Sequence, residues 1–312
     1  MNRMQFSRLL APIMAAWLAC LVQQAPAQDR LDNTPRLAVI GAFAPELEAL
    51  LARTEVERTV EQNGVTFSLG KLAGRDVVVF ASGVSMVNAA MTTQLALDKF
   101  RVEAVIVDGI AGGVDPNLDI GDVVVPAQWG QYLEAIFARE TDKGFAPPPW
   151  AELPFPNFGM IFPQNVDIRR KGSAEPESKF WFAADAAMLD AASKIVDSVE
   201  LKSCSAENAC LPTPPRIVVG GNGVSGQAFV DNAKFRDFTA ATFQAQVLDM
   251  ETAAIATVAY ANGVPFIGFR SLSDLAGGGP GENEMETFMT VAAENAAAVL
   301  VAFIGALPPP SP

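Results

Sequence analysis

The chain has 312 residues, half of them apolar, and carries 35 acidic against 22 basic side chains, a formal net charge of −13. This length and apolar content suffice for one large folded domain or two small ones. Such an excess of negative charge repels nucleic-acid phosphates and anionic lipids, so both are disfavoured as partners. The sequence contains no histidine, which excludes Ser-His-Asp and Cys-His catalysis and histidine-ligated metals. Acid–base chemistry must come from carboxylates, lysine, tyrosine or bound water.

The N-terminus has the pattern of an export signal. Two arginines precede an apolar run at residues 9–22, and small residues follow at 25–27. The run is shorter than the roughly 20 apolar residues that a membrane-spanning helix needs. We therefore expect a signal peptide at residues 1–27 and a mature protein that is periplasmic or secreted. A membrane anchor, or a lipoprotein attached through Cys20, is the alternative.

Export bears on the cysteines that remain after cleavage. Cys204 and Cys210 are six positions apart, and a disulfide that closes this short loop is expected in an oxidising compartment. Two unpaired surface thiols are the alternative. The three cysteines are too few for a thiolate metal cluster and show no CxxC spacing, so no metal site is predicted.

Apolar, β-branched runs predict strands at 36–43, 65–69, 76–81, 104–107, 122–126, 216–220, 246–250 and 265–271. Helical spacing predicts helices at 46–53, 87–100, 185–199, 231–243, 251–262 and 284–304, with Asp231 as a cap of the fourth and Gly263 ending the fifth. The Pro- and aromatic-rich stretch 129–176 is expected to be ordered loop packed by its own rings. The alternation of predicted strands and helices indicates one α/β domain at 28–312, with helices on both faces of the sheet. An insertion is expected within it at about 129–215.

Three carboxylates follow predicted strands, at the edge where α/β sheets bind ligands. They are Glu46, Glu251 and Asp274. Glycine clusters, which let a ligand approach the backbone closely, lie at 109–113, 220–226 and 277–281. None of them fits a P-loop or a dinucleotide-binding fingerprint, so no nucleotide cofactor is predicted. Taken singly, each acid is better explained by helix capping or by solvation than by a catalytic role.

Together, the segments that contain these residues resemble the methylthioadenosine/S-adenosylhomocysteine nucleosidases, members of the purine nucleoside phosphorylase superfamily. The segments are 39–46 (VIGAFAPE), 82–84 (SGV), 109–113 (GIAGG), 248–251 (LDME) and 271–274 (SLSD). The resemblance covers 36–128 and 216–304 and implies an α/β fold, a three-layer αβα sandwich with a mixed central sheet. The middle block, with Phe180, Trp181 and Phe182, is more similar to the secreted plant bark and vegetative storage proteins.

The resemblance implies a role for each acid. Glu46 would activate the attacking water, Asp274 would protonate the purine at N7, and Glu251 would accept the ribose hydroxyls. Cleavage of an N-glycosidic bond needs the same functions, because the sugar becomes cationic while negative charge develops on the departing base. A raised pKa at the proton donor would follow from burial. Neither histidine, metal nor cofactor is required.

The other implied contacts surround the nucleoside. Phe43 would line the pocket at the 5′ side of the sugar, and Phe229 would stack on the base. The backbone of Val230 would read the base edge. Met250 would lie on the ribose, and Ser273 would lie beside the proton-donating acid.

Two departures from the family bear on the nucleophile. Phosphorylases of the superfamily hold phosphate with an arginine in the first glycine loop and with arginine and serine near the second. Here residues 41–45 contain no arginine and residues 107–110 contain neither. Water is therefore the favoured nucleophile. Ile110 replaces a serine of the nucleosidases, and Ala44-Pro45 replaces the acidic pair that they have just before Glu46. Both changes affect the residues expected to position the attacking water.

The sequence thus predicts an exported purine nucleosidase, with a phosphate-dependent purine nucleoside phosphorylase as the first alternative. A non-catalytic nucleoside-binding or storage protein is the second, although the complete set of three acids argues against it. The resemblance also implies a homodimer in which the partner chain closes the 5′ end of the pocket. The aromatic residues of the insertion would either add apolar surface to that interface or form a lid on their own domain. They are Trp129, Trp150, Phe155, Phe158 and Phe162.

Overall fold

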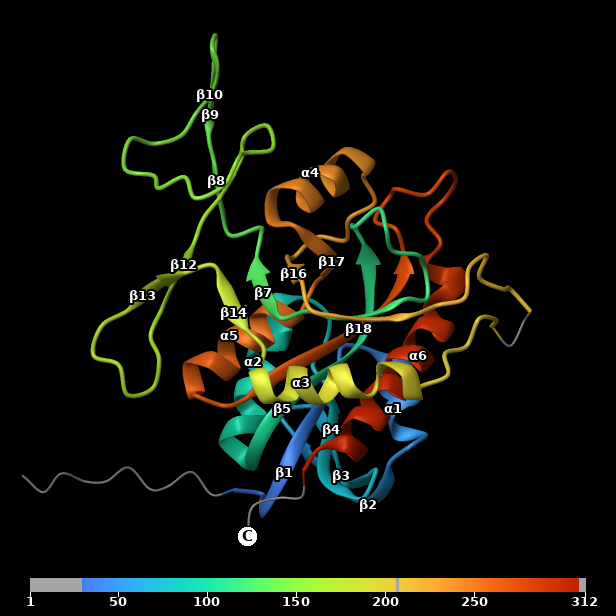
Figure 1. Ribbon diagram of the computed structural model, residues 1–312. Coiled ribbons are helices and arrows are strands. Elements are labelled where there is room, and N and C mark those ends of the chain that lie inside the picture. The colour runs from blue at the N-terminus through green and yellow to red at the C-terminus, as the bar shows by residue number, and fades with distance from the viewer. Residues whose placement is uncertain (1–29, 206–207, 309–312) are drawn as a thin grey trace, which may run out of the picture.

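The computed structural model describes residues 30–205 and 208–308. The expected signal peptide, residues 1–27, lies outside them, and its cleavage stays a prediction. Within the described part, twelve strands form one main sheet, helices cover it, and smaller strand pairs project from one end (Figure 1).

The main sheet is mixed. Its strands are β1 (Asp32–Gly41), β2 (Glu55–Gln62), β3 (Val65–Leu72), β4 (Arg75–Ala81), β5 (Phe100–Gly113), β6 (Val123–Val125), β7 (Gln128–Gln131), β14 (Trp181–Ala183), β15 (Ile217–Val219), β16 (Asn222–Ser225), β17 (Ala245–Asp249) and β18 (Phe266–Asp274). The main path is β14-β7-β16-β17-β5-β1-β4-β3-β2; β18 pairs with β5 and β6, and β6 also pairs with β15. The central strand β5 is parallel to β1 and β18 but antiparallel to β17.

Helices cover both faces of this sheet. They are α1 (Ala44–Leu51), α2 (Met86–Lys99), α3 (Ala186–Lys194), α4 (Ala233–Phe243), α5 (Thr252–Asn262) and α6 (Met285–Ala306). Adjacent residues of β18 show the two faces, because Phe269 packs on Phe303 of α6 while Arg270 donates to Thr252 at the start of α5. On these faces α1 packs against α6 and α2 packs against α5. The predicted three-layer αβα sandwich is confirmed.

The last helix, α6, is a core element. By length and composition it could cross a membrane, but 56% of its most apolar window is buried in the fold. Small residues such as Ala293 and Ala297 are fully covered and bring the helix close to β5 and β18. Its N-terminus lies at the same end of the sheet as the carboxyl end of β18, so Met285 and Asp274 line one cavity.

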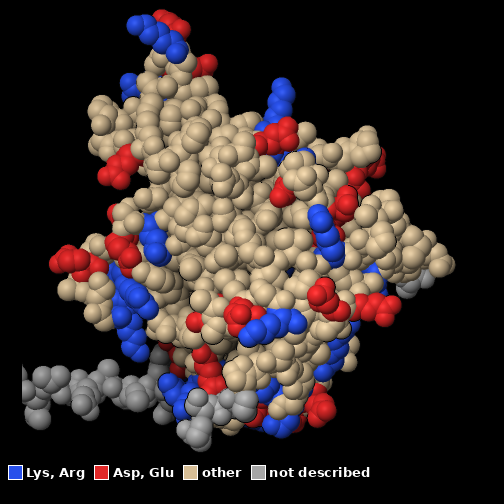
Figure 2. Space-filling view, in the orientation of Figure 1, with Lys and Arg blue, Asp and Glu red and all other residues tan. Residues whose placement is uncertain are grey.

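The insertion contains more regular structure than predicted, so the expectation of loop alone is wrong. Its strands are β8 (Ala135–Phe137), β9 (Arg139–Thr141), β10 (Gly144–Ala146), β11 (Ile161–Pro163), β12 (Val166–Ile168) and β13 (Glu177–Lys179), which pair as β8–β11, β9–β10 and β12–β13. These short pairs satisfy backbone hydrogen bonds where the sequence shows no alternation of apolar and polar residues. They project from the body of the molecule (Figure 1), and acidic and basic side chains stand together at the tip (Figure 2).

Two strands and one helix cap also differ from the predictions, each for a physical reason. The strand β2 was not predicted because it is an exposed edge strand of mostly charged and polar residues without an apolar run. The glycine cluster at 220–226 contains β16, which pairs with β7 and β17. The cap of α4 is Asn232 rather than Asp231, because the Asn232 side chain accepts the backbone N–H of Phe235 at 2.9 Å.

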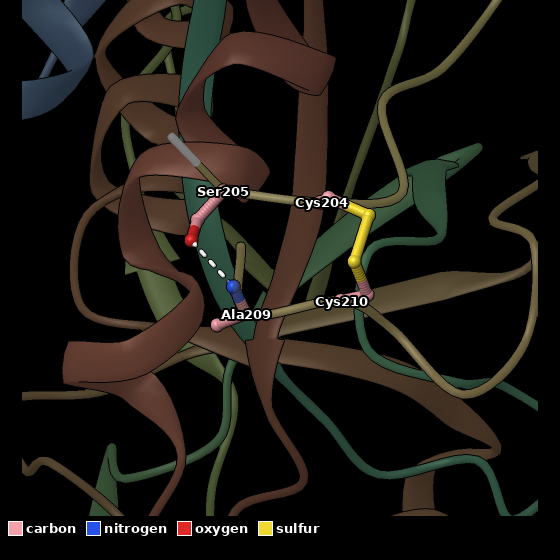
Figure 3. Close-up of a disulfide and its surroundings, with 4 residues drawn as sticks. All are labelled: Cys204, Ser205, Ala209 and Cys210. Carbon is pink, nitrogen blue, oxygen red and sulfur yellow. Dashed lines mark hydrogen bonds between the residues drawn. A yellow bond between two sulfur atoms is a disulfide. The ribbon is translucent and has the colours of Figure 1, made fainter. Parts of the chain in front are cut away.

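Cys204 and Cys210 form a disulfide (Figure 3). The two cysteines also make an isolated antiparallel bridge, and the Ala209 backbone N–H donates to the Ser205 hydroxyl at 3.2 Å within the loop. The structure therefore agrees with the pairing expected from the spacing.

Breaking this bond with Cys204→Ser and Cys210→Ser should lower the free energy of unfolding by only about 2 kcal/mol, since the closed loop is short. The base of the loop keeps its contacts with α6, where Asn295 accepts the backbone N–H of Lys202 at 2.7 Å and donates to its carbonyl at 3.0 Å. Intact-mass spectrometry of the unreduced protein should find the pair oxidised. Two thiols that react with an alkylating agent without prior reduction would reject the bond.

Candidate active site

One cavity of about 240 Å³ lies at the carboxyl ends of β5, β17 and β18 and at the start of α6. It collects every residue that the sequence predicts to contact a nucleoside: Phe43, Glu46, Phe229, Val230, Met250, Glu251, Ser273 and Asp274. Ala42, Val84, Ile110, Leu248 and Met285 complete much of its apolar wall. The segments come from distant parts of the chain, and the sheet brings their ends together.

Glu46 stands in the first turn of α1 with its carboxylate fully enclosed. One oxygen accepts the backbone N–H of Ala42, and the other accepts that of Ile110 at 2.8 Å and lies 3.3 Å from the Arg270 guanidinium. Burial raises the pKa of Glu46, whereas Arg270 and the two N–H groups lower it. Ile110 lines the cavity, and its backbone N–H donates to the carboxylate.

Arg270 connects the acids behind the cavity wall. Its side chain is 1% exposed, and its nitrogens lie 2.8 Å from Asp249, 3.3 Å from Glu46 and 3.7 Å from Glu251. It also donates to the Thr252 hydroxyl at 2.8 and 3.0 Å. Arg270 was not predicted as a site residue from the sequence, although a lone basic residue inside a largely apolar strand is a signal that could have indicated it.

Glu251 is the residue immediately before α5 and is 6% exposed. Its Oε1 accepts the backbone N–H of Ser85 at 2.7 Å, which ties the loop before α2 to the cavity. Burial raises the pKa of Glu251 to about 7, and the neighbouring Asp249 contributes to the rise. Ser85 has φ +80°, a conformation that residues with side chains rarely adopt, so its amide direction is imposed by the surroundings.

Asp274 ends β18, and its side chain is 2% exposed. Its carboxylate accepts the backbone N–H of Ala276 at 2.8 Å and the Ser273 hydroxyl at 3.0 Å, and the Asn283 amide lies at 3.4 Å. Burial raises the pKa of Asp274, and these hydrogen bonds act in the opposite direction. Such a carboxyl group holds its proton to higher pH than an exposed one, as a general acid requires.

The close approach of Glu46 and Arg270 depends on Gly109. This glycine has φ +156°, and a Cβ atom there would lie 2.1 Å from both the Glu46 carboxylate and the Arg270 guanidinium. Only a residue without a side chain leaves room for the contact.

Gly109→Ala should therefore displace the Glu46 carboxylate and lower any nucleoside cleavage by about 100-fold, because misplacement of a catalytic group by about 1 Å has such an effect. Gly74→Ala is the matched control: Gly74 has φ +77° and no atom within 4 Å of the added Cβ, so only backbone strain is introduced. Steady-state rates and thermal unfolding of both variants give the comparison. Equal rates for the two variants would contradict the role assigned to Gly109.

Comparisons with known proteins agree with this geometry. Residues 36–305 match the family described as the phosphorylase superfamily. A 5′-methylthioadenosine/S-adenosylhomocysteine nucleosidase of Marinomonas is 31% identical over 267 residues, 85% of this chain and 96% of that one. Bark storage protein A of Populus deltoides is 27% identical over 288 residues, 89% and 87% of the two chains.

A solved structure with the same fold is that of a 5′-methylthioadenosine/S-adenosylhomocysteine nucleosidase of Colwellia psychrerythraea in complex with adenine. It has a TM-score of 0.65 and 27% sequence identity, and the match covers 87% of this chain and 95% of that chain. From its sequence and its fold together, the chain belongs to the 5′-methylthioadenosine/S-adenosylhomocysteine nucleosidase family of the phosphorylase superfamily.

Proposed function

We propose that the protein is a purine nucleosidase that hydrolyses the N-glycosidic bond of a nucleoside of the methylthioadenosine or S-adenosylhomocysteine type. The observation that carries the proposal is the convergence of Glu46, Glu251 and Asp274 on one apolar cavity, each with different hydrogen-bond partners. Family membership supports the same reaction class. A storage protein would need the fold but not three enclosed acids around one cavity.

Asp274 is the proton donor in this proposal. Burial keeps its pKa above the ordinary range, and the Ser273 hydroxyl and the Ala276 N–H hold the carboxyl group in one orientation. Protonation of the purine at N7 neutralises the charge that develops as the base leaves. Phe229 and Val230 line the same cavity and would hold the base.

Glu46 and Glu251 act on the sugar and on the attacking water. Glu46 is held by two backbone N–H groups and by Arg270, which favour its ionised form as a base that takes a proton from water. Glu251 would accept the ribose hydroxyls, with Met250 beside the ring. Two carboxylates near the sugar also stabilise its cationic transition state.

The charges around the cavity favour water over phosphate as the nucleophile that attacks the sugar. No lysine or arginine is among the described residues that line it, and Arg270, the guanidinium just behind the wall, is committed to three carboxylates. A phosphate ion would meet negative charge without charge-assisted donors. Phosphorolysis is therefore the less favoured alternative.

Purine nucleosides assayed with and without phosphate test the proposal. Free sugar should form in both cases, and Asp274→Asn should lower turnover by about 10²- to 10⁴-fold while the fold is kept. Asp237→Asn, at an exposed acid on α4, is the control and should change little. Sugar phosphate as the product would point to a phosphorylase, and no base release would point to a binding or storage protein.

We further propose a homodimer that closes the cavity. Val84 and Phe229 line the cavity yet are 44% and 54% exposed, and Val87 and Met91 continue the apolar surface along α2 at 65% and 62%. The insertion offers less exposed apolar surface for such an interface than the sequence suggested. Trp129 and Phe162 are buried in their own domain, although Trp150 is exposed. The exposed face of α2 is thus the better candidate interface.

Light scattering at micromolar concentration should give about twice the mass of the processed chain. Val87→Glu with Met91→Glu should yield monomers with weaker substrate binding, since charge on the face disfavours pairing and leaves the cavity open. Val56→Glu, at an equally apolar but remote position that is 44% exposed on β2, should leave the mass unchanged. A monomeric wild-type protein would contradict the proposal.

Export of the mature chain is part of the proposal. The arginine-flanked apolar run near the N-terminus and the Cys204–Cys210 disulfide both support an oxidising compartment outside the cytoplasm. The intact mass that tests the disulfide also locates the cleavage site. A full-length mass for the protein recovered from its native cells would argue against processing.

A further inference from the structure

Two loops beside the cavity are fastened to each other. The loop between β16 and α4 contains Phe229 and Val230, and the glycine-rich loop between β18 and α6 directly follows Asp274. The backbone N–H of Asn232 in the first loop donates to the carbonyl of Ala276 in the second at 3.1 Å. The segment proposed to bind the base is thereby linked to the segment that follows the proposed proton donor.

The contact between the loops is close enough to require a glycine. Gly277 has φ +85°, and a Cβ atom there would lie 2.3 Å from the backbone nitrogen of Asn232 and 2.6 Å from the carbonyl carbon of Asp231. Ala276 also has a positive φ, +52°, and its N–H donates to the Asp274 carboxylate at 2.8 Å. An alanine keeps such a conformation only where its surroundings impose it, so the path of the loop after Asp274 is set by these contacts.

Asn283, near the end of the glycine-rich loop, bridges two carboxylates. Its Nδ2 lies 3.4 Å from Oδ1 of Asp274 and 3.2 Å from Oδ1 of Asp231, and its Oδ1 accepts the backbone N–H of Met285 at 3.0 Å. Only this orientation of the amide suits its neighbours, because the reverse would place a carbonyl oxygen against two carboxylates and an N–H group against another N–H group. The reaction described above does not use Asn283.

The donors around Asp274 are divided unevenly between its two oxygens. Oδ1 receives the Ala276 N–H and the Asn283 amide, whereas Oδ2 lies 3.0 Å from the Ser273 hydroxyl. That hydroxyl is also 3.4 Å from the Ala111 carbonyl, to which it can donate, and a hydroxyl that donates there can still accept from Oδ2. With two N–H donors on Oδ1, the proton of a neutral Asp274 belongs on Oδ2.

We propose that Asn283 is a positioning residue for the proton donor: its amide holds Oδ1 of Asp274, so that Oδ2 presents the proton to the departing base. The inference rests on the proposed function for the role of Asp274. When the bond between the sugar and the purine breaks, its electron pair passes to the purine, and the Oδ2 proton moves to N7. The oxygen of water joins the sugar, and Glu46 takes its proton. The amide of Asn283 then stabilises the carboxylate left on Asp274.

Charged groups from several elements surround the proton donor. Burial and the charge of Glu284 at the start of α6 raise the pKa of Asp274, whereas its hydrogen bonds, that of Asn283 among them, lower it. The charged residues of the other neighbouring elements are Glu46 in α1, Asp231 before α4, Arg236 in α4, Asp249 at the end of β17 and Glu251 before α5. Arg236 donates to the carbonyl of Gly113. Loss of the Asn283 amide should therefore raise the pKa of Asp274, because a donor to the ionised form is removed.

A double-mutant cycle with Asn283→Ser and Asp274→Asn tests the proposal. Serine is neutral and too short to reach Asp274, but it can still accept the Met285 N–H, so the start of α6 is kept. Asn283→Ser should lower kcat about tenfold and leave KM within about twofold, because a hydrogen bond to the ionised acid is lost. In the Asp274→Asn background the same change should alter kcat by less than about twofold, because no proton donor remains to be positioned.

Asn157→Ser is the matched control. Asn157 is exposed in the insertion, and its amide donates to the carbonyl of Gly159, so this variant should leave kcat unchanged. If Asn283→Ser does not fold, Asn283→Thr removes the same amide, keeps a capping hydroxyl and enters the same cycle. Equal losses of kcat in both backgrounds would assign Asn283 a structural role only and overturn the proposal, as would an unchanged kcat in the wild-type background.

An NMR titration separates this inference from the function on which it rests. If the wild-type protein cleaves no nucleoside, the proposed function fails, but the carbon-13-labelled carboxyl group of Asp274, assigned by its loss in Asp274→Asn, still reports its ionisation. The pKa of Asp274 should be higher in Asn283→Ser than in the wild-type protein. An unchanged titration would mean that the amide does not act on the acid, which overturns the inference whether or not the protein is active.

Discussion

The buried guanidinium of Arg270 is the interaction on which the rest of the site depends. It reaches Asp249 at the end of β17, Glu46 in α1 and Glu251 at the start of α5, and thereby fixes three elements around the carboxyl end of β18. Removing one partner of a buried ion pair leaves an uncompensated charge and costs about 3–5 kcal/mol. The same contacts hold the acids in fixed positions, which is the preorganisation that charge-stabilising catalysis needs.

In the proposed mechanism, different surroundings suit chemically similar carboxyl groups to different roles. Burial raises the pKa of both Glu46 and Asp274, but Glu46 also faces two backbone N–H groups and a guanidinium, which lower its pKa, whereas Asp274 has no guanidinium partner. Burial and the neighbouring Asp249 raise the pKa of Glu251 to about 7, while Arg270 and the Ser85 N–H lower it. A base, an acid and a ribose ligand can therefore be built from carboxylates in a chain without histidine.

Much of the fold and most of the cavity could be predicted from the sequence, because the strands of the core are continuous apolar runs and the acids directly follow them. Arg270 could not be predicted, since it lies inside a largely apolar strand and only the packed structure shows what surrounds it. The edge strand β2 was not predicted either, because its residues are mostly exposed and polar and show no apolar pattern. The strand pairs of the insertion depend on contacts between residues distant in sequence, such as those of β8 with β11, which local patterns do not encode.

A crystal structure of the protein with a purine nucleoside analogue that carries a cationic sugar ring would test the central claim most directly. The account predicts Asp274 within hydrogen-bond distance of N7, Glu251 on the ribose hydroxyls, and a water molecule held between Glu46 and the anomeric carbon. Arg270 should remain bound to Asp249 and Glu46 in that complex. An analogue bound outside this cavity, or with its purine N7 turned away from Asp274, would contradict the account.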